Sequence, residues 1–173
     1  GLWGASSLIE SVQTGTITWT SGASSTATIS AVDPTRTVVF LLGSTSLYSG
    51  SVPYEAQAYV TVTNATTVTA TMYATSSYQR WVGYAVVQFA PGVIKRIQTG
   101  TITLTAATSN TATISEINTA KSVLTNVGYY STSYRYVSDY MGYFALTNST
   151  TVTLSRAVAD LNMIGSFQVV EFF

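Results

Sequence analysis

The sequence contains no cysteine and no histidine, and only 14 of its 173 residues are charged, seven of each sign. Without these residue types the chain can form no disulfide, no Ser-His-Asp triad, no cysteine nucleophile and no thiolate zinc site. A net charge of zero also argues against nucleic-acid binding, because affinity for phosphates depends on an excess of lysine and arginine. We therefore expect a protein that is not an enzyme, holds no metal or cofactor and binds no nucleic acid.

Long apolar segments are missing as well. The longest wholly apolar run, residues 38–42, is far shorter than the ~20 residues that a membrane-spanning helix needs, so we expect no membrane partner. Hydroxyl side chains are abundant instead, with 22 serines, 30 threonines and 12 tyrosines. Hydrophobic residues still make up 46% of the chain, which excludes simple disorder and is enough for a packed core.

An internal repeat organises the sequence. Four blocks recur in the same order: QTGTITWT at 13–20 and QTGTITLT at 98–105, TATIS at 26–30 and 111–115, TNATTVT at 63–69 and TNSTTVT at 147–153, and VVQF at 86–89 and VVEF at 169–172. The sequence Ala90-Pro91-Gly92 forms the natural seam between the copies. We predict an N-terminal arm at 1–7, a first repeat at 8–91 and a second repeat at 92–173.

Each half predicts about six strands, because β-branched and aromatic residues alternate with polar ones. The expected strands are 16–20, 27–29, 38–42, 59–63, 68–73 and 84–89, followed by 101–105, 111–114, 122–127, 143–147, 151–155 and 166–172. The run at 38–42 is wholly apolar, which predicts a strand covered on both faces. The predicted fold is all-β, with two tandem homologous antiparallel β-sandwich repeats of jelly-roll-like form.

Asparagines occupy equivalent places between predicted strands. Asn64 and Asn148 each begin an N-glycosylation triplet. Asparagine also tolerates turn conformations, and a turn explains both positions without a sugar. We therefore interpret these two residues as turn residues.

The few charges also bear on assembly. Open sandwiches leave edge strands, which charged side chains usually protect from pairing with other chains. With only 14 charges, we expect neighbouring subunits to cover these edges.

A tyrosine-rich segment stands where the two repeats diverge. Tyrosine and arginine are enriched at protein contact surfaces, whereas the competing interpretation is that these rings only cover the ends of the sandwich. Apolar residues on a terminal arm dock either onto another protein or onto the chain's own core. The candidate contact residues are Tyr129, Tyr130, Tyr134, Arg135, Tyr136, Tyr140 and Tyr143, with Tyr48 and Tyr54 in the first repeat and Leu2 and Trp3 in the arm. Both protein and glycan remain open as the ligand of these rings.

The repeated blocks resemble a family of uncharacterised virion proteins of tailed bacteriophages. The resemblance is carried by IQTGTIT at 97–103, TATISEINTAKSV at 111–123 and FQVVEF at 167–172. It extends over both halves and is less close in the first, which has DPTRT at 33–37 where the second has NTAKS at 118–122. The resemblance implies a structural part of a phage particle, either a head decoration protein, a head fibre or a tail component, without catalytic residues.

These observations favour a non-enzymatic virion structural protein, and within that class a capsid decoration or cement protein. The expected partners are further copies of the chain, for which a trimer would present six similar sandwiches, and other virion proteins such as the major capsid protein. The expected location is the virion, assembled in the bacterial host cytoplasm. One alternative is a head- or tail-fibre module that binds host surface glycans. Another is a secreted carbohydrate-binding or glycan-cleaving domain, although the spacing of the seven carboxylates signals no catalytic pair.

Overall fold

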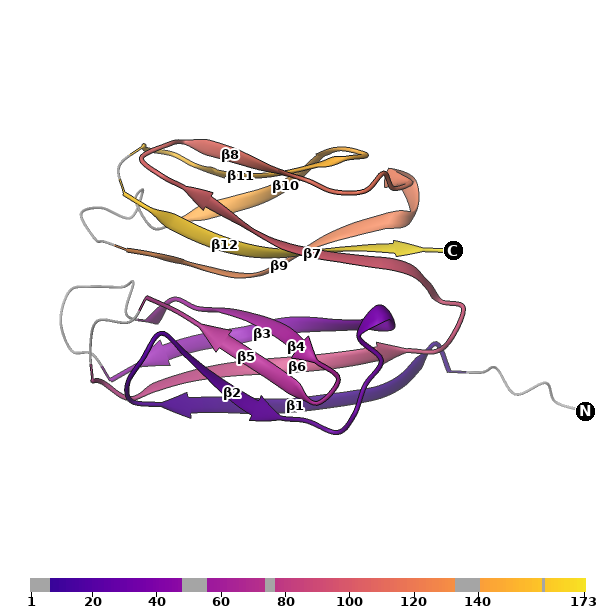
Figure 1. Ribbon diagram of the computed structural model, residues 1–173, viewed down its shortest axis with the longest axis horizontal. Helices are drawn as coiled ribbons and strands as arrows, with labels where there is room; N and C mark the ends of the chain where they lie inside the picture. Colours follow the sequence, from indigo (N-terminus) through magenta and orange to yellow (C-terminus); the bar gives the residue numbers. More distant parts are fainter. Residues whose placement is uncertain (1–6, 48–55, 74–76, 133–140, 160) are drawn as a thin grey trace, which may run out of the picture.

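The computed structural model describes residues 7–47, 56–73, 77–132, 141–159 and 161–173, and within them the fold is all-β with antiparallel sheets (Figure 1). This confirms the predicted fold class. The strands are β1 (Ile9–Trp19), β2 (Ser24–Thr28), β3 (Thr37–Ser46), β4 (Tyr59–Asn64), β5 (Thr67–Thr71), β6 (Arg80–Phe89), β7 (Ile94–Leu104), β8 (Ser109–Thr113), β9 (Ser122–Ser131), β10 (Gly142–Asn148), β11 (Thr151–Arg156) and β12 (Met163–Phe172). Two 3-10 turns precede β3 and β9, namely η1 (Pro34–Arg36) and η3 (Thr119–Lys121).

Strand pairing follows the same plan in both halves. In the first half the orders are β1-β6-β3 and β2-β5-β4, and in the second they are β7-β12-β9 and β10-β11-β8. The first strand thus pairs with the sixth and the second with the fifth, which is the pairing of a jelly roll reduced to six strands. The β4 edge meets the β9 edge, so β2-β5-β4-β9-β12-β7 is one six-stranded sheet across both halves.

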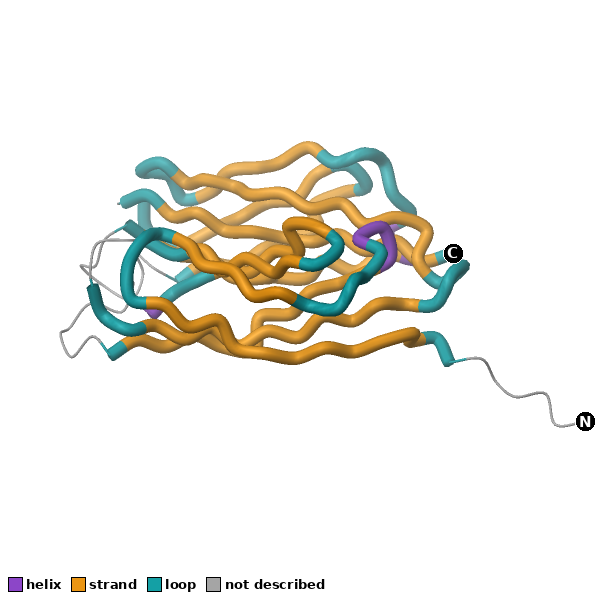
Figure 2. The backbone as a smooth tube through the Cα atoms, turned by 60° about the horizontal axis from the view of Figure 1, so that its bottom comes forward, coloured by secondary structure: helices purple, strands orange, loops and turns teal. Residues whose placement is uncertain are grey.

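Two apolar cores lie between the sheets of each half. Alternate residues of the strands point inward, as the period of a β-strand requires. In the first half Ile17, Val39, Val82 and Val86 on one sheet face Val60 and Val68 on the other. In the second half Ile102, Leu104, Phe167 and Val169 face Val152 and Leu154. The loops and turns gather at the two ends of the strands (Figure 2).

Equivalent positions of the two halves make the same local contacts. Gln13 receives the Ser30 N–H at 2.7 Å, and Gln98 receives the Ser115 N–H at the same distance. Asn64 and Asn148 each accept the backbone N–H two residues further on, at 2.9 Å. The predicted turn role of both asparagines is therefore what the structure shows.

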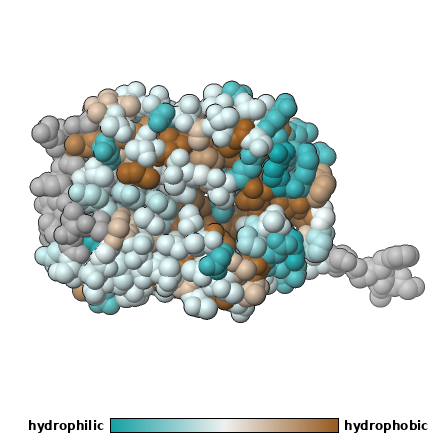
Figure 3. Space-filling view, in the orientation of Figure 1, coloured by the Kyte–Doolittle hydropathy of each residue, from teal (hydrophilic) through white to brown (hydrophobic). Residues whose placement is uncertain are grey.

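A third apolar cluster joins the halves. It contains Val38, Ile94 and Val170, and beside it the rings of Phe89 and Phe172 meet edge to face with centroids 6.2 Å apart. The ends of β6 and β12 and the start of β7 lie together there (Figure 1). Figure 3 shows hydrophobic side chains gathered in the band between the halves on that side.

The expectation that residues 38–42 are covered on both faces was wrong for the second part of the run. Val38 and Val39 are buried, but Phe40 and Leu42 are exposed. The physical reason is that the second half reaches only the start of β3, where Val38 joins the third cluster. A continuous apolar run therefore outlasts the contact that covers it within one chain.

Candidate interaction surfaces

Three of the tyrosines predicted to make contacts lie in the described part of the chain. Tyr129 and Tyr130 are on β9, and Tyr143 is on β10. The other predicted contact residues, Leu2, Trp3, Tyr48, Tyr54, Tyr134, Arg135, Tyr136 and Tyr140, lie outside the described residues.

The three described tyrosines have different surroundings. Tyr130 is half-buried and stacks on Tyr59 of the first half, with ring centroids 5.8 Å apart. Burial, and then the neighbouring Tyr59, raises the pKa of Tyr130 above its usual value of 10.0. Tyr129 donates its hydroxyl hydrogen to the sulfur of Met141 at 3.5 Å. Tyr143 is exposed to solvent, so it alone of the three is open to a large partner.

The stacked pair belongs to a close junction between the halves. Tyr59 of β4 lies opposite Gly128 of β9, and this is the position where the two sheets join. Gly128 has a φ of +112°, and a Cβ there would collide with the carbonyl oxygen of Ala58. Only glycine satisfies both conditions. Two further bonds cross the junction, from Val39 N–H to Gln168 Oε1 at 3.2 Å and from Ser131 N–H to Gln57 Oε1 at 3.1 Å.

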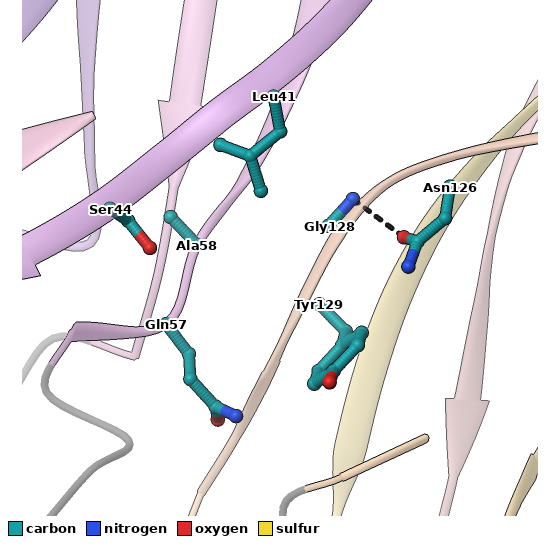
Figure 4. Close-up of a pocket in the computed structure, with 7 residues that line it drawn as sticks. All are labelled: Leu41, Ser44, Gln57, Ala58, Asn126, Gly128 and Tyr129. Carbon is teal, nitrogen blue, oxygen red and sulfur yellow. Dashed lines mark hydrogen bonds between the residues drawn. The ribbon is translucent and has the colours of Figure 1, made fainter. Parts of the chain in front are cut away.

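A pocket of about 350 Å³ opens beside this junction. Figure 4 shows its residues on two walls, one from β3 and the segment before β4, the other from β9. The lining is Leu41, Ser44, Gln57, Ala58, Asn126, Gly128 and Tyr129. None of these residues is charged, and Ser44, Gln57 and Asn126 bring hydroxyl and amide groups that both donate and accept hydrogen bonds. The pocket therefore suits a small neutral polar ligand.

The outer face of the sheet β1-β6-β3 is apolar and open. On β6, Tyr84 and Val86 point into the core, so the residues between them point outward. Cross-strand partners share a face, and Val12 pairs with Val87 while Phe40 pairs with Ala85. We call this surface the open face, and define it by Val12, Phe40, Leu42, Trp81, Ala85 and Val87.

Charged side chains gather at the η1 and η3 end of the molecule. Arg36 bonds to both Glu10 and Asp33, while Glu171 is buried between Lys95 at 2.8 Å and Arg96 at 3.0 Å. The Lys95 ammonium, the Asn118 N–H and the Arg96 guanidinium lower the pKa of Glu171 to about 2. Because these charges pair with each other, they leave the open face uncharged.

The described residues hold no group of three or more acidic side chains that could bind a metal ion. In the same part of the chain, no helix has the length and apolar character needed to cross a membrane. No protein-family model, no curated protein and no solved structure matches the chain.

Sequence reasoning missed the pocket and the junction. Their residues come from segments about 70 to 85 positions apart, and only folding brings them together. One signal was available, because Gly43 and Gly128 stand at equivalent positions of the repeat. Both have positive φ, and a glycine kept in two copies within a strand indicates a bulge or a close backbone approach.

Proposed function

We propose that this chain is a non-enzymatic structural protein of a bacteriophage particle, and that it decorates the capsid by surface contacts with neighbouring subunits. The open face is the observation that carries the proposal. A sheet face with Val12, Phe40 and Leu42 exposed and no charge on it is typical of a surface that another protein covers. The resemblance of the repeated blocks to virion proteins of tailed phages points to the particle as the place where this covering occurs.

The proposed mechanism needs no chemistry. Burial of apolar surface contributes roughly 25 cal/mol per Å², so many bound copies add stability to a shell. Exposed strand edges extend the same surface, since an unpaired edge accepts another chain. Each subunit would therefore act as a clamp between its neighbours.

The proposal is tested with heads stripped of accessory proteins. Purified chain is added back, and the bound fraction is measured by sedimentation. Val12→Asp places a charge on the open face and should lower binding by about tenfold or more. Val158→Asp is the matched control, because Val158 is also exposed but lies off this face. Equal binding by wild type and Val12→Asp would contradict the proposal.

A second candidate function is recognition of a neutral sugar on the host surface, and the pocket at the junction favours it. The pocket is near the lower end of ligand-site volumes, which suits a single sugar ring. Sugar hydroxyls donate and accept hydrogen bonds, as do Ser44, Gln57 and Asn126, and the Tyr129 ring offers an apolar surface.

Titration of isotope-labelled chain with neutral hexoses, followed by NMR, tests this candidate. Signals of Asn126 and Tyr129 should shift with neutral sugars and not with a sugar phosphate. Ser44→Leu fills the pocket and should abolish the shifts, whereas Ser109→Leu puts the same side chain on exposed β8, outside the pocket, and should preserve them. Shifts that persist in Ser44→Leu would refute the pocket as the site.

A further inference from the structure

The junction between the halves is one-sided. Val38 of the first half is 2% exposed, whereas Val123, its equivalent 85 residues later, is 44% exposed. A two-fold junction would bury equivalent residues equally, because each patch would contact its own copy. The junction is therefore heterologous: the first half presents β3 and β4, and the second half receives them on β9 and β12.

The presenting surface recurs, uncovered, on the second half. Tyr59 of β4 stacks on the other half, and its equivalent 84 residues later, Tyr143 of β10, is 64% exposed. Together with Val123 it marks the surface that the second half would present to a further sandwich. We call Val123 and Tyr143 the presenting surface.

The receiving surface recurs, uncovered, on the first half. Val127 and Val170 of the second half are each 1% exposed, because the first half covers them. The equivalent of Val127 is Leu42, which is 62% exposed. A Cβ at Gly128 would collide with the first half, whereas nothing described lies within 4 Å of a Cβ at Gly43.

We propose that a second copy of this chain covers the open face, head to tail, by repeating the junction that joins the two halves. The presenting surface of one copy would pack on Leu42, Gly43 and Val87 of the next. This inference rests on the proposed function and names the partner of the open face. Heterologous contacts build either a closed ring or a filament, and closure after three chains gives a ring of six sandwiches.

The repeated junction differs from the original in one contact. Gln168 accepts the Val39 N–H across the halves, but its equivalent 83 residues earlier is Ala85, which has no side-chain acceptor. The contact between copies is therefore weaker by that hydrogen bond. It is also not held by the chain connection at residues 90–93, so it depends on protein concentration.

The mass of the purified full chain in solution, measured by light scattering over a range of concentrations, tests the inference. Wild type should associate as its concentration rises. Val123→Asp on the presenting surface and Leu42→Asp on the receiving surface should each raise the apparent Kd by about a hundredfold or more. Val158→Asp is the matched control, because Val158 is also 44% exposed, and it should associate like wild type.

Mixing the two defective variants distinguishes a head-to-tail contact from a symmetric one. The Val123→Asp chain retains an intact receiving surface, and the Leu42→Asp chain retains an intact presenting surface. A mixture should therefore form dimers and stop there. In a symmetric contact every mixed pair would carry a charge in the interface, and mixing would restore nothing.

Three results would overturn the inference: a wild type that stays monomeric at its highest soluble concentration, association that both variants leave intact, or a mixture that fails to dimerise. A monomeric chain whose binding to heads is still lost in Val12→Asp would refute the copy-to-copy contact alone. The proposed function fails separately, if Val12→Asp binds heads like wild type.

Discussion

At the scale of single residues, Glu171 and Gln88 show how one position of the repeat serves two environments. Gln88 Oε1 accepts the Asp33 N–H at 2.9 Å, and Glu171 Oε1 accepts the Asn118 N–H at 3.0 Å. The carboxylate appears where Lys95 and Arg96 stand beside it, whereas the first half has Glu10 and Ser11 at those positions. A shared backbone contact thus persists while the charge changes with its neighbours.

Glu171→Gln should weaken the acid sensitivity of the fold. The pKa of Glu171 is about 2 in the folded chain, against an ordinary 4.5, so its stabilising effect is full above the ordinary value and is lost as pH falls from about 5 toward 2. The variant keeps an acceptor for the Asn118 N–H but has no charge to lose. Urea unfolding across this window should show a shallower fall in the free energy of unfolding than in wild type.

Part of the acid sensitivity should remain in Glu171→Gln. Hydrogen bonding to Arg36 lowers the pKa of Glu10, and hydrogen bonding to Thr35 lowers that of Asp33, so both carboxylates add to the same trend. An unfolding free energy that falls with acid as steeply as in wild type would show that Glu171 does not contribute.

Gly100→Ala should destabilise the second half. A Cβ at Gly100 would lie 2.8 Å from the ring of Phe167, which is buried and directly opposite on β12. Overpacking of this kind costs ~1–3 kcal/mol, which calorimetry would register as a lower Tm. Combining it with Phe167→Leu should cost less than the sum of the two single changes, because the smaller side chain relieves the contact. Strict additivity would argue against the contact.

At the scale of elements, alternation along strands carried most of the fold. Residues 16–20 and 101–105 follow a clear period of two, and the structure places them in β1 and β7, apart from the last residue of each range. The strands are longer than predicted, because β1 begins at Ile9 and pairs with β6 along nearly its whole length. Local patterns mark a strand, but the partner strand decides where it ends.

The candidate site was much less predictable than the strands. Tyr130 looked like a contact residue for another protein from composition alone, but the structure stacks it on Tyr59 within the chain. Gln57 and Asn126 carried no signal at all, because their proximity depends on how the halves pack. Repeat symmetry is the exception, since comparing Gly43 with Gly128 reveals which junction is occupied and which is open.

Gly128→Ala should loosen the junction and leave the cores of the halves formed. The substitution meets both a positive φ and a collision with Ala58, so β4 and β9 must separate. Hydrogen exchange should speed up at the Val39 and Ser131 amides, which bond across the junction, and stay slow at Val86 in the core.

Gly92→Ala is the matched control for this prediction. Gly92 also has a positive φ, of +82°, but an added Cβ there would meet nothing within 4 Å. It carries backbone strain without the collision, so junction amides should keep their protection. If both variants behave alike, the close approach of β4 to β9 does not hold the junction.

At the scale of the whole molecule, the chain places its apolar and charged surfaces apart. The described ion pairs lie at the η1 and η3 end, and the open face runs along the sheet β1-β6-β3 without charge. Threonine takes much of the remaining strand surface, as at Thr26, Thr28 and Thr63. A surface kept soluble by hydroxyl groups carries little charge repulsion against close neighbours.

Electron cryo-microscopy of intact particles, with the copies of this chain counted, tests the account most directly. We predict density for the double sandwich in regular, stoichiometric copies on the head, with the sheet β1-β6-β3 covered by a neighbouring protein. A handful of copies at the tail, or head-bound copies whose β1-β6-β3 face is bare to solvent, would contradict it.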